Sequence, residues 1–474
     1  MHLTVIGAPG TGKTSYIEKL IKERGNSDFL YLTYNKAMAI VAEKRLGSDG
    51  KVATFHSEMS KRNGLNNFLS RTEIIDFAKS IGLTFPQNGH VIDKVNGKTN
   101  IERFLLCDDL TIQTMVQPYQ PINETLNLRY IKKEYEAYKE ELGKLDYTDV
   151  IRIGAENTYT VGDLYIDEAQ DLTPLMWKIV DNFQAKNVTI AGDPHQSIYS
   201  YKGVMVKEFQ KRMDTENIKI LDTSHRYGDN LRKLSELALG NGRVMNVPYA
   251  GSGNTEIDHY SLENMSKLEG TKAILCRTNA LARYLAVNLP YAVVNIKKDN
   301  SYPNGWHETT FQVAKIMKKW PDINSSEFSY IVNHSSANMW VRGTQAKVKR
   351  KELTLFNYDL MKKKMGASEL ITHMNLDEKV KKNAIRLLKD DIPIIYCDTI
   401  HAAKGLEYDH VMLITDIPKS IEDDFNKEEH RILYVGMTRA KKSMNFQNIG
   451  FYKGTYDIPG YSKTLNTSIS LVYL

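Results

Sequence analysis

The stretch GAPGTGKT, Gly7–Thr14, decides the fold of this chain. The apolar run HLTVI, His2–Ile6, precedes it and has the composition of a β-strand. The residues that follow, SYIEKLIKERG, place apolar side chains at helical spacing and end at Gly25, a residue typical of a helix C-cap. A glycine-rich loop between a strand and a helix is the setting in which this pattern binds phosphate.

The residue types in this loop suit a nucleoside triphosphate and its magnesium ion. Gly10 and Gly12 let backbone N–H groups close around phosphates, and the N-terminus of the following helix adds positive potential. We expect Lys13 to reach the β- and γ-phosphates and the Thr14 hydroxyl to bind Mg²⁺. The alternative is a glycine turn that binds nothing. The residues expected to bind nucleotide are Gly7, Ala8, Pro9, Gly10, Thr11, Gly12, Lys13 and Thr14.

A second apolar run ends in two adjacent carboxylates. Residues GDLYI, Gly162–Ile166, are predicted to form a strand, and Asp167 and Glu168 follow it. Asp167 can bind Mg²⁺, and Glu168 can orient or deprotonate the water that attacks the γ-phosphate. Such a pair can also be the acidic first turn of a helix. Beside a phosphate-binding loop, the hydrolytic interpretation is favoured.

A third predicted strand, Val188–Ala191, is followed by polar and aromatic residues. Gln196 stands beyond its end, where it could sense a γ-phosphate. Tyr201 and Lys202 come next, and an exposed ring beside a cation suits stacking on an unpaired base and contact with its phosphate. We expect Tyr199, by contrast, to lie in the core.

The bulk composition is that of a soluble globular protein. The chain has 474 residues, of which 42% are hydrophobic and 25% charged, and its net charge of +6 does not by itself indicate a nucleic-acid binder. The three cysteines lack the spacing of a zinc site or a disulfide framework, which favours a reducing cytoplasm. The sequence shows no signal peptide and no apolar run of about 18 residues, so no membrane association is expected.

Further motifs along the chain resemble, in their order, those of the UvrD/Rep/PcrA group of superfamily 1 helicases. The matching segments, besides the glycine loop and DEAQD, are LTYNKAM (Leu32–Met38), TFHS (Thr54–Ser57), GDPHQSIYSYKG (Gly192–Gly203), LDTSHR (Leu221–Arg226), AILCRTNALAR (Ala273–Arg283), TIHAAKGLEYDHVMLI (Thr399–Ile414) and EEHRILYVGMTRAKK (Glu428–Lys442). The resemblance implies an ATP- and Mg²⁺-dependent motor that moves 3′ to 5′ on single-stranded DNA and unwinds duplex DNA at junctions. It also implies the cytoplasm of a prokaryotic or phage-infected cell.

The resemblance assigns roles to residues outside the glycine loop. Arg226 and Arg439 would face the γ-phosphate, Glu407 would lie near the ribose, and His225 would stack on adenine where the family usually has tyrosine. The family's glutamine upstream of the loop has no counterpart here, which leaves open the preference for ATP over other nucleoside triphosphates. The residues that would contact DNA are Lys36, Thr54, His56, Tyr201, Lys202 and His401.

The fold that the resemblance implies is α/β, with two RecA-like P-loop motor domains that have parallel sheets and each carry a mainly helical insertion. The first motor would comprise residues 1–60 and 145–225, its insertion 61–144, the second motor 226–295 and 388–474, and its insertion 296–387. This last insertion is short for the family. It contains Trp306, Trp320, Trp340 and the basic run KVKRKE, which either contact duplex DNA or form a solvated face.

Three functions remain open at this level. The favoured one is a helicase that separates DNA strands. The short second insertion motivates another, a translocase on single-stranded DNA that remodels protein–DNA complexes and unwinds little. The third is a regulatory protein that binds nucleoside triphosphate without translocating. RNA is a weaker choice of track, because nothing in the sequence indicates recognition of a 2′-hydroxyl.

Overall fold

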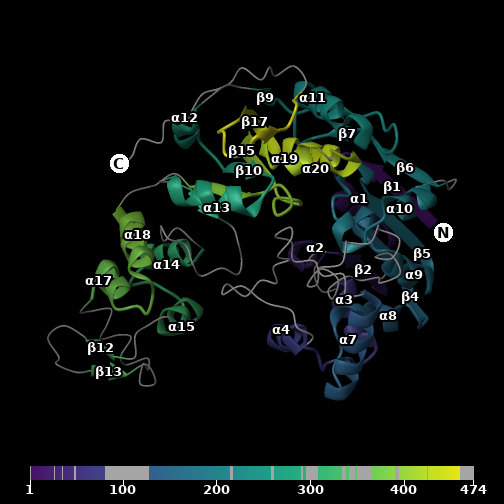
Figure 1. Cartoon of the computed structure of the whole chain (residues 1–474), viewed down its shortest axis with the longest axis horizontal. Coiled ribbons are helices and arrows are strands. Elements are labelled where there is room, and N and C mark those ends of the chain that lie inside the picture. Colours follow the sequence, from purple (N-terminus) through teal and green to yellow (C-terminus); the bar gives the residue numbers. More distant parts are fainter. Residues whose placement is uncertain are drawn as a thin grey trace. The chain divides into compact units, whose positions relative to one another are not determined.

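The computed structural model describes residues 2–25, 27–34, 36–46, 50–80, 128–213, 217–257, 261–289, 292–294, 308–333, 338–340, 347–349, 365–389, 394–423 and 425–458. The chain divides into two compact units. The first is Met1–Arg232, Leu239–Gly253 and Asn426–Tyr434, and the second is Lys233–Ala238, Asn254–Phe425 and Val435–Leu474. Each unit contains a six-stranded sheet with helices packed on it, which confirms the predicted α/β class (Figure 1).

The sheet of the first unit has the order β3-β2-β4-β5-β1-β6, and every pair of neighbours is parallel. Because parallel strands need crossover connections, helices cover both faces of the sheet. The inner strands are largely buried, whereas the edge strand β6 is mostly exposed. The strands are β1 (His2–Gly7), β2 (Phe29–Thr33), β3 (Lys51–Thr54), β4 (Tyr159–Asp167), β5 (Phe183–Gly192) and β6 (Ile218–Leu221).

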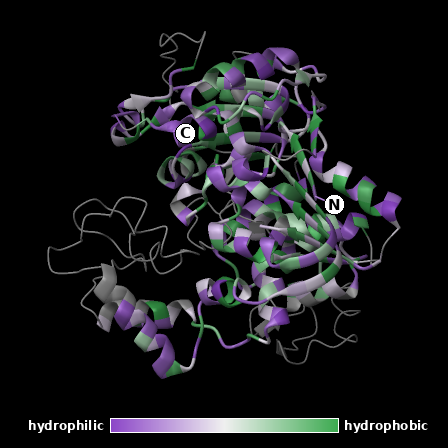
Figure 2. Ribbon diagram, turned by 90° about the vertical axis from the view of Figure 1, so that its right-hand side faces the viewer, coloured by the Kyte–Doolittle hydropathy of each residue, from purple (hydrophilic) through white to green (hydrophobic). Residues whose placement is uncertain are grey.

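Side chains of these strands alternate between two apolar clusters, as the period of a strand requires. Val5, Tyr31 and Ala191 belong to the cluster formed with α1 (Lys13–Arg24) and α2 (Lys36–Leu46). Ile6, Leu32 and Ile166 belong to the other, which is completed by α3 (Phe55–Arg62), α8 (Tyr147–Gly154), α9 (Pro174–Asp181) and α10 (Val206–Met213). Figure 2 shows hydrophobic residues concentrated along many of the strands.

The second unit contains a parallel sheet of order β11-β14-β10-β15-β17-β9. Helices α12 (Leu262–Lys267) and α13 (Asn279–Asn288) contribute to the apolar cluster on one of its faces. The division between the units falls within helices α11 (Asp229–Leu239) and α20 (Lys427–Met437). The strands are β9 (Glu256–Ile257), β10 (Lys272–Cys276), β11 (Ala292–Val294), β14 (Ile395–Thr399), β15 (Tyr408–Ile414) and β17 (Ala440–Gln447).

The described parts of the two predicted insertions are mainly helical. In the first, α4 (Arg71–Ser80) packs on α7 (Leu128–Leu142) through Phe77 and Tyr135, whose ring centres are 5.1 Å apart. In the second, helices surround an apolar cluster of their own, and Trp320 packs there with its indole N–H donating to the Met365 carbonyl at 2.9 Å. These helices are α14 (Glu308–Lys318), α15 (Ser325–Asn333), α17 (Ala367–Thr372) and α18 (Glu378–Lys389).

The remaining residues of the predicted duplex-contacting cluster are only partly described. The backbone of Trp340 and of Lys347–Lys349 forms β12 (Asn338–Trp340) and β13 (Lys347–Lys349), an antiparallel pair. Trp306 lies outside the described residues. The domain boundaries proposed from the sequence stay a prediction.

Local elements follow their sequence signals closely. Gly25 caps α1 with a left-handed φ of 58°, and its N–H donates to the Ile21 carbonyl at 3.2 Å. The predicted strands Gly162–Ile166 and Val188–Ala191 lie inside longer strands. The first residues of these strands alternate buried Tyr159 and Phe183 with exposed Thr160 and Gln184, so they do not form a continuous apolar run. None of the described helices is long and apolar enough to span a bilayer.

Asp398, at the end of β14, is a buried carboxylate that is only half satisfied. Its Oδ1 accepts the Thr399 N–H at 2.8 Å, and Oδ2 has no hydrogen-bond partner among the described residues. Burial raises the pKa of Asp398 to about 6. The folded state therefore binds this proton more tightly than the unfolded state, so stability is lost as pH rises from about 4 to 6.

We expect Asp398→Asn to raise the free energy of unfolding at pH 8 by about 1 to 3 kcal/mol, because the amide never ionises. Below about pH 3 the wild-type carboxyl is largely protonated in both the folded and the unfolded state, and the two proteins should be equally stable. Denaturant unfolding at pH 3 and pH 8 measures the difference. A stability difference of equal size at both pH values would contradict this account.

Candidate nucleotide site and its surroundings

The glycine loop joins β1 to α1 and is held by its own lysine. Gly10 and Gly12 have φ of 80° and 83°, a region that residues with a Cβ rarely adopt. The Lys13 ammonium donates to the Gly7 carbonyl at 2.7 Å and to the Ala8 carbonyl at 3.2 Å. The loop thus holds a buried cation at the N-terminus of a helix, the arrangement expected to attract phosphate.

The Asp167 carboxylate lies beside this loop at the end of β4. Its Oδ2 accepts the Thr14 hydroxyl at 2.7 Å and the Tyr31 hydroxyl at 2.6 Å. Burial, and then the Glu168 carboxylate, raise the pKa of Asp167, while the two hydroxyls oppose the shift. A buried carboxylate of this kind is stabilised in its ionised form by a cation, and Thr14 and Asp167 offer the oxygen ligands that Mg²⁺ prefers.

Among the described residues, no group of three or more His, Cys, Asp and Glu side chains could hold a metal ion. A magnesium ion beside Thr14 and Asp167 would therefore need phosphate or water oxygens as well, as is usual for this metal. The metal site stays a prediction.

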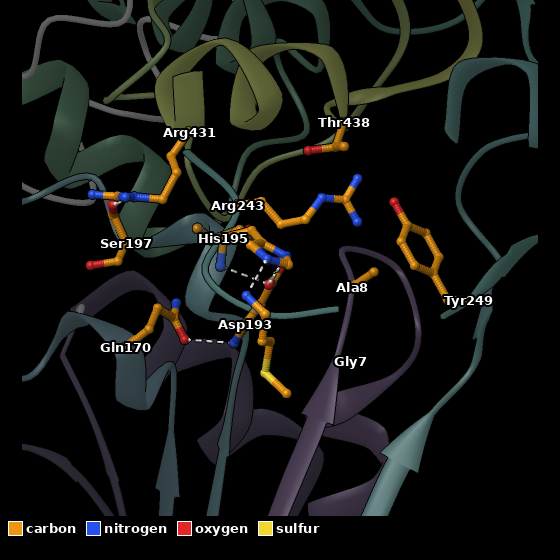
Figure 3. Close-up of polar contacts among 12 residues, drawn as sticks. Gly7, Ala8, Gln170, Asp193, His195, Ser197, Arg243, Tyr249, Arg431 and Thr438 are labelled. Carbon is orange, nitrogen blue, oxygen red and sulfur yellow. Dashed lines mark hydrogen bonds and ion pairs between the residues drawn. The ribbon is translucent and has the colours of Figure 1, made fainter. Parts of the chain in front are cut away.

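Glu168 is connected to the neighbouring strand by a chain of hydrogen bonds. Among the described residues it is the only one besides glycines with positive φ, 55°, a strained conformation of the kind found at functional sites. The Gln170 amide, in η1 (Ala169–Asp171), donates to Glu168, and its Oε1 accepts the Asp193 N–H at 2.9 Å (Figure 3). Asp193 Oδ2 in turn accepts the Gln196 amide at 2.9 Å.

This chain brings Glu168 and Gln196 into one network because β4 and β5 are neighbours, with Ile166 opposite Ile190. Gln170 was missed by the sequence reasoning, although it stands in the quoted DEAQD segment. Its role depends on which strand lies next to β4, and that order is not a local property of the sequence.

The segment that carries Arg226 is attached directly to the glycine loop. The Ser224 hydroxyl donates to the Pro9 carbonyl at 2.7 Å, and the His225 N–H donates to the Gly10 carbonyl at 2.9 Å. A Cβ on Gly10 would lie only 2.4 Å from the Cβ of Arg226. The backbone of Arg226 is thus adjacent to the loop and belongs to the first unit, although the predicted second motor begins at this residue.

Two histidines near the glycine loop differ in burial: His225 is exposed, and His195, in the loop after β5, is buried. The His225 ring is exposed, with Nδ1 3.2 Å from the Ser252 hydroxyl. His195, in η2 (Pro194–Gln196), is buried; its Nε2 accepts the Met245 N–H at 3.4 Å, and Nδ1 lies 3.6 Å from Asp193. Burial lowers the pKa of His195, which favours a neutral ring with its proton on Nδ1.

The N-terminal part of α20, which belongs to the first unit, holds the loop beyond His195. The buried Arg431 guanidinium donates to the Ser197 carbonyl at 2.7 Å (Figure 3). Glu428 accepts the Ser200 N–H at 2.8 Å and also the Ser200 hydroxyl. Two charged side chains of one helix therefore fix the segment between Gln196 and Tyr201. This link could not be predicted from the sequence, because the two segments are more than 200 residues apart along the chain.

The tyrosines around this segment form a stack with a cation. Tyr199 is half-buried rather than in the core as predicted, and its ring stacks on Tyr34 with centres 6.0 Å apart. The Lys202 ammonium lies 4.7 Å from the Tyr199 ring centre and 5.4 Å from that of Tyr34. The side chain of Tyr201, whose backbone lies in η3 (Ser200–Lys202), is outside the described residues.

The predicted DNA-contacting segment after β3 carries a further aromatic group. Thr54 caps α3, and its hydroxyl oxygen accepts the Ser57 N–H at 3.3 Å. His56 packs edge-on against Tyr147, which stacks on Phe68 with ring centres 5.6 Å apart. Tyr147 is nevertheless 58% exposed. Lys36, the first residue of α2, is also exposed. The contacts of Lys36, Thr54 and His56 with DNA stay predictions.

Known proteins match this chain over most of its length. Residues 1–202 match the family described as AAA domain, and residues 307–448 match the UvrD-like helicase C-terminal domain. The chain is 24% identical to F-box DNA helicase 1 of Gallus gallus, over 93% of this chain and 46% of the relative. It is 22% identical to the ATP-dependent DNA helicase Rep of Buchnera aphidicola, over 83% and 82% of the two chains.

The chain belongs to the UvrD-like superfamily 1 helicases. The resemblance inferred from the motifs is thereby confirmed. The ATP-dependent DNA helicase PcrA of Leuconostoc citreum is also similar, with 24% identity over 62% of this chain and 48% of that protein. The chain spans about half the length of the F-box helicases that it matches, 46% of the Gallus gallus protein and 55% of that from Schizosaccharomyces pombe.

Three predicted site residues of this UvrD-like chain lie in the second unit. Arg439 is buried, and its guanidinium donates to the carbonyls of Val435 and Leu406 at 2.9 and 3.2 Å. Glu407 is exposed and lies 3.3 Å from the Lys441 ammonium. His401 is half-buried in the turn after β14. The roles of Arg439 and Glu407 towards nucleotide, and of His401 towards DNA, stay predictions.

Proposed function

We propose that this chain hydrolyses ATP to move 3′ to 5′ along single-stranded DNA and to separate duplex DNA. The observation that carries the proposal is the connected group at the end of β1, β4 and β5. Lys13, Thr14 and Asp167 lie together there, and hydrogen bonds run from Glu168 to Gln196. Family membership supports the activity, and relatives named as ATP-dependent DNA helicases support the substrate.

The chemistry assigns a task to each of these groups. Lys13 balances the charge of the β- and γ-phosphates, and Thr14 and Asp167 would hold Mg²⁺, which when bound neutralises charge on the transferred phosphoryl group. The Glu168 carboxylate, oriented by the Gln170 amide, positions the attacking water. Arg226, whose backbone adjoins Gly10, supplies a second cation to the γ-phosphate.

The same network supports a route from hydrolysis to DNA. Gln196 senses the γ-phosphate, and the segment that follows leads to the aromatic rings and the Lys202 ammonium. Because Arg431 and Glu428 fix Ser197 and Ser200, a shift of Gln196 reaches the DNA-contacting residues through a short, restrained segment. The 3′ to 5′ direction rests on the family alone.

The test combines two assays on the purified chain. ATPase is measured with and without single-stranded DNA, and unwinding is measured on duplexes with a 3′ or a 5′ tail. We expect DNA-stimulated ATPase and unwinding of the 3′-tailed duplex. Stimulated ATPase without strand separation would favour the single-stranded-DNA translocase, and ATPase that ignores DNA would contradict both motor functions.

Tyr147 provides a prediction for DNA binding. We expect Tyr147→Ala to weaken the affinity for single-stranded DNA by about 5- to 150-fold, because loss of one stacked base costs about 1 to 3 kcal/mol. The DNA concentration that half-saturates ATPase measures the effect. Tyr147→Phe keeps the ring and should bind as the wild type does. Equal affinities for all three proteins would show that the exposed ring does not contact bases.

A further inference from the structure

The segment Leu239–Gly253 returns to the phosphate side of the first unit, and two contacts fix it there. The Met245 N–H donates to Nε2 of the buried His195 at 3.4 Å. Farther along, β8 (Ala250–Gly251) pairs with β7 (Thr223–Ser224), the strand just before Arg226. Both anchoring points therefore belong to the surroundings of the glycine loop.

Two side chains of this segment, Arg243 and Tyr249, extend towards each other. Figure 3 shows the Arg243 guanidinium extended towards the Tyr249 hydroxyl, above Ala8. The Tyr249 hydroxyl accepts that of the buried Tyr227 at 3.2 Å, which fixes its position. Arg243 is exposed, and its contact with the Asn246 side chain is long, at 3.5 Å.

The positive charge of Arg243 affects the buried His195. Burial is the largest cause of the lowered pKa of His195. The Asp193 carboxylate raises this pKa, and the positive charge of Arg243 lowers it. The imidazole that accepts the Met245 N–H thus remains neutral, and Arg243 supplies positive charge on this side of the loop. The Lys13 ammonium uses two of its three N–H donors on the Gly7 and Ala8 carbonyls, so a further cation besides Arg226 adds positive charge for the phosphates.

We infer that Arg243 binds the terminal phosphate of the nucleotide, with its guanidinium reaching across Ala8 to the γ-phosphate oxygens. A guanidinium presents paired N–H donors that match two oxygens of one phosphate group. This assignment deepens the proposed function and rests on it, since it requires that the glycine loop bind a nucleoside triphosphate. It makes Arg243 a residue that distinguishes the triphosphate from the diphosphate.

The test compares two ligands on the full chain, fluorescently labelled ADP and a non-hydrolysable ATP analogue with the same label. We expect Arg243→Ala to lower affinity for the triphosphate by about 10- to 100-fold, the range for a hydrogen bond to a charged group. Affinity for ADP should change little, which also reports that the variant is folded. The affinity of Arg243→Lys for the triphosphate should lie between those of the wild type and Arg243→Ala, because lysine keeps the charge without the paired N–H donors.

Arg45→Ala is the matched control, since Arg45 is an exposed arginine of the same unit whose partner is Glu18 on α1. Its affinities for both ligands should equal those of the wild type. If Arg243→Ala leaves the triphosphate-to-diphosphate ratio unchanged, or weakens both ligands equally, the assignment is overturned while the proposed function stands. If the wild-type chain binds neither ligand, both are overturned.

Discussion

Replacing Lys13 with alanine is expected to lower ATP turnover by at least about 10²- to 10³-fold, the usual effect of removing one preorganised charge-stabilising donor. The ammonium is buried in the loop and fixed by the Gly7 and Ala8 carbonyls. It is therefore in place before the phosphates arrive, and its loss removes positive charge where negative charge is transferred. Steady-state ATPase at saturating DNA measures the change.

Single-stranded DNA binding should survive this substitution, because the residues proposed to contact DNA lie on other segments, such as Tyr147 on α8 and Lys202 after β5. Lys19→Ala is the matched control. Lys19 lies on the same helix with its side chain 70% exposed and paired with Glu23, so its removal should leave turnover unchanged. A Lys13→Ala protein that binds DNA and retains most of its ATPase would remove the glycine loop from the mechanism.

The parts of the site that could be predicted from sequence are those in which neighbours along the chain do the chemistry. The glycine loop is one, because strand, loop and helix follow each other within a few residues and the positive φ of Gly10 and Gly12 needs glycine. The pair Asp167 and Glu168 is another, since it directly follows a buried strand. The two parallel sheets followed from the family resemblance carried by these and the later motifs.

The parts that could not be predicted depend on which strands are neighbours. Tyr31 donates to Asp167 because β2 lies beside β4, with Thr33 opposite Asp167. Gln170 reaches Asp193 because β5 lies on the other side of β4. Tyr199 was expected in the core because aromatic residues usually are, but Tyr34 and the Lys202 ammonium hold its ring at the surface.

Arg226 shows how a family role and a local structure can be combined. The resemblance places an arginine finger at this residue, and the predicted boundary made it the first residue of the second motor. In the structure its segment is hydrogen-bonded to the glycine loop through Ser224 and His225, and it belongs to the first unit. The backbone contacts explain this outcome, because a segment bonded to the loop moves with the loop.

We expect Arg226→Ala to lower kcat by about 10³- to 10⁵-fold, the usual contribution of an arginine finger to phosphoryl transfer. The side chain of Arg226 begins beside Gly10, in the loop that is proposed to hold the phosphates. Since this cation acts chiefly on charge that develops in the transition state, KM for ATP should change much less than kcat. Arg226→Lys keeps the positive charge but lacks the paired N–H donors of the guanidinium, so its kcat should lie between those of the wild type and Arg226→Ala.

Comparison of Arg226 with Arg243 distinguishes a cation that stabilises the transition state from one that binds the γ-phosphate in the ground state. The proposed contact of Arg243 already exists in the bound ground state, so its loss should appear in the affinity for the triphosphate. Loss of Arg226 should appear in single-turnover hydrolysis of nucleotide that is already bound. If Arg226→Ala instead weakened triphosphate binding and left the single-turnover rate intact, Arg226 would be a binding residue, and another group would have to stabilise the transition state.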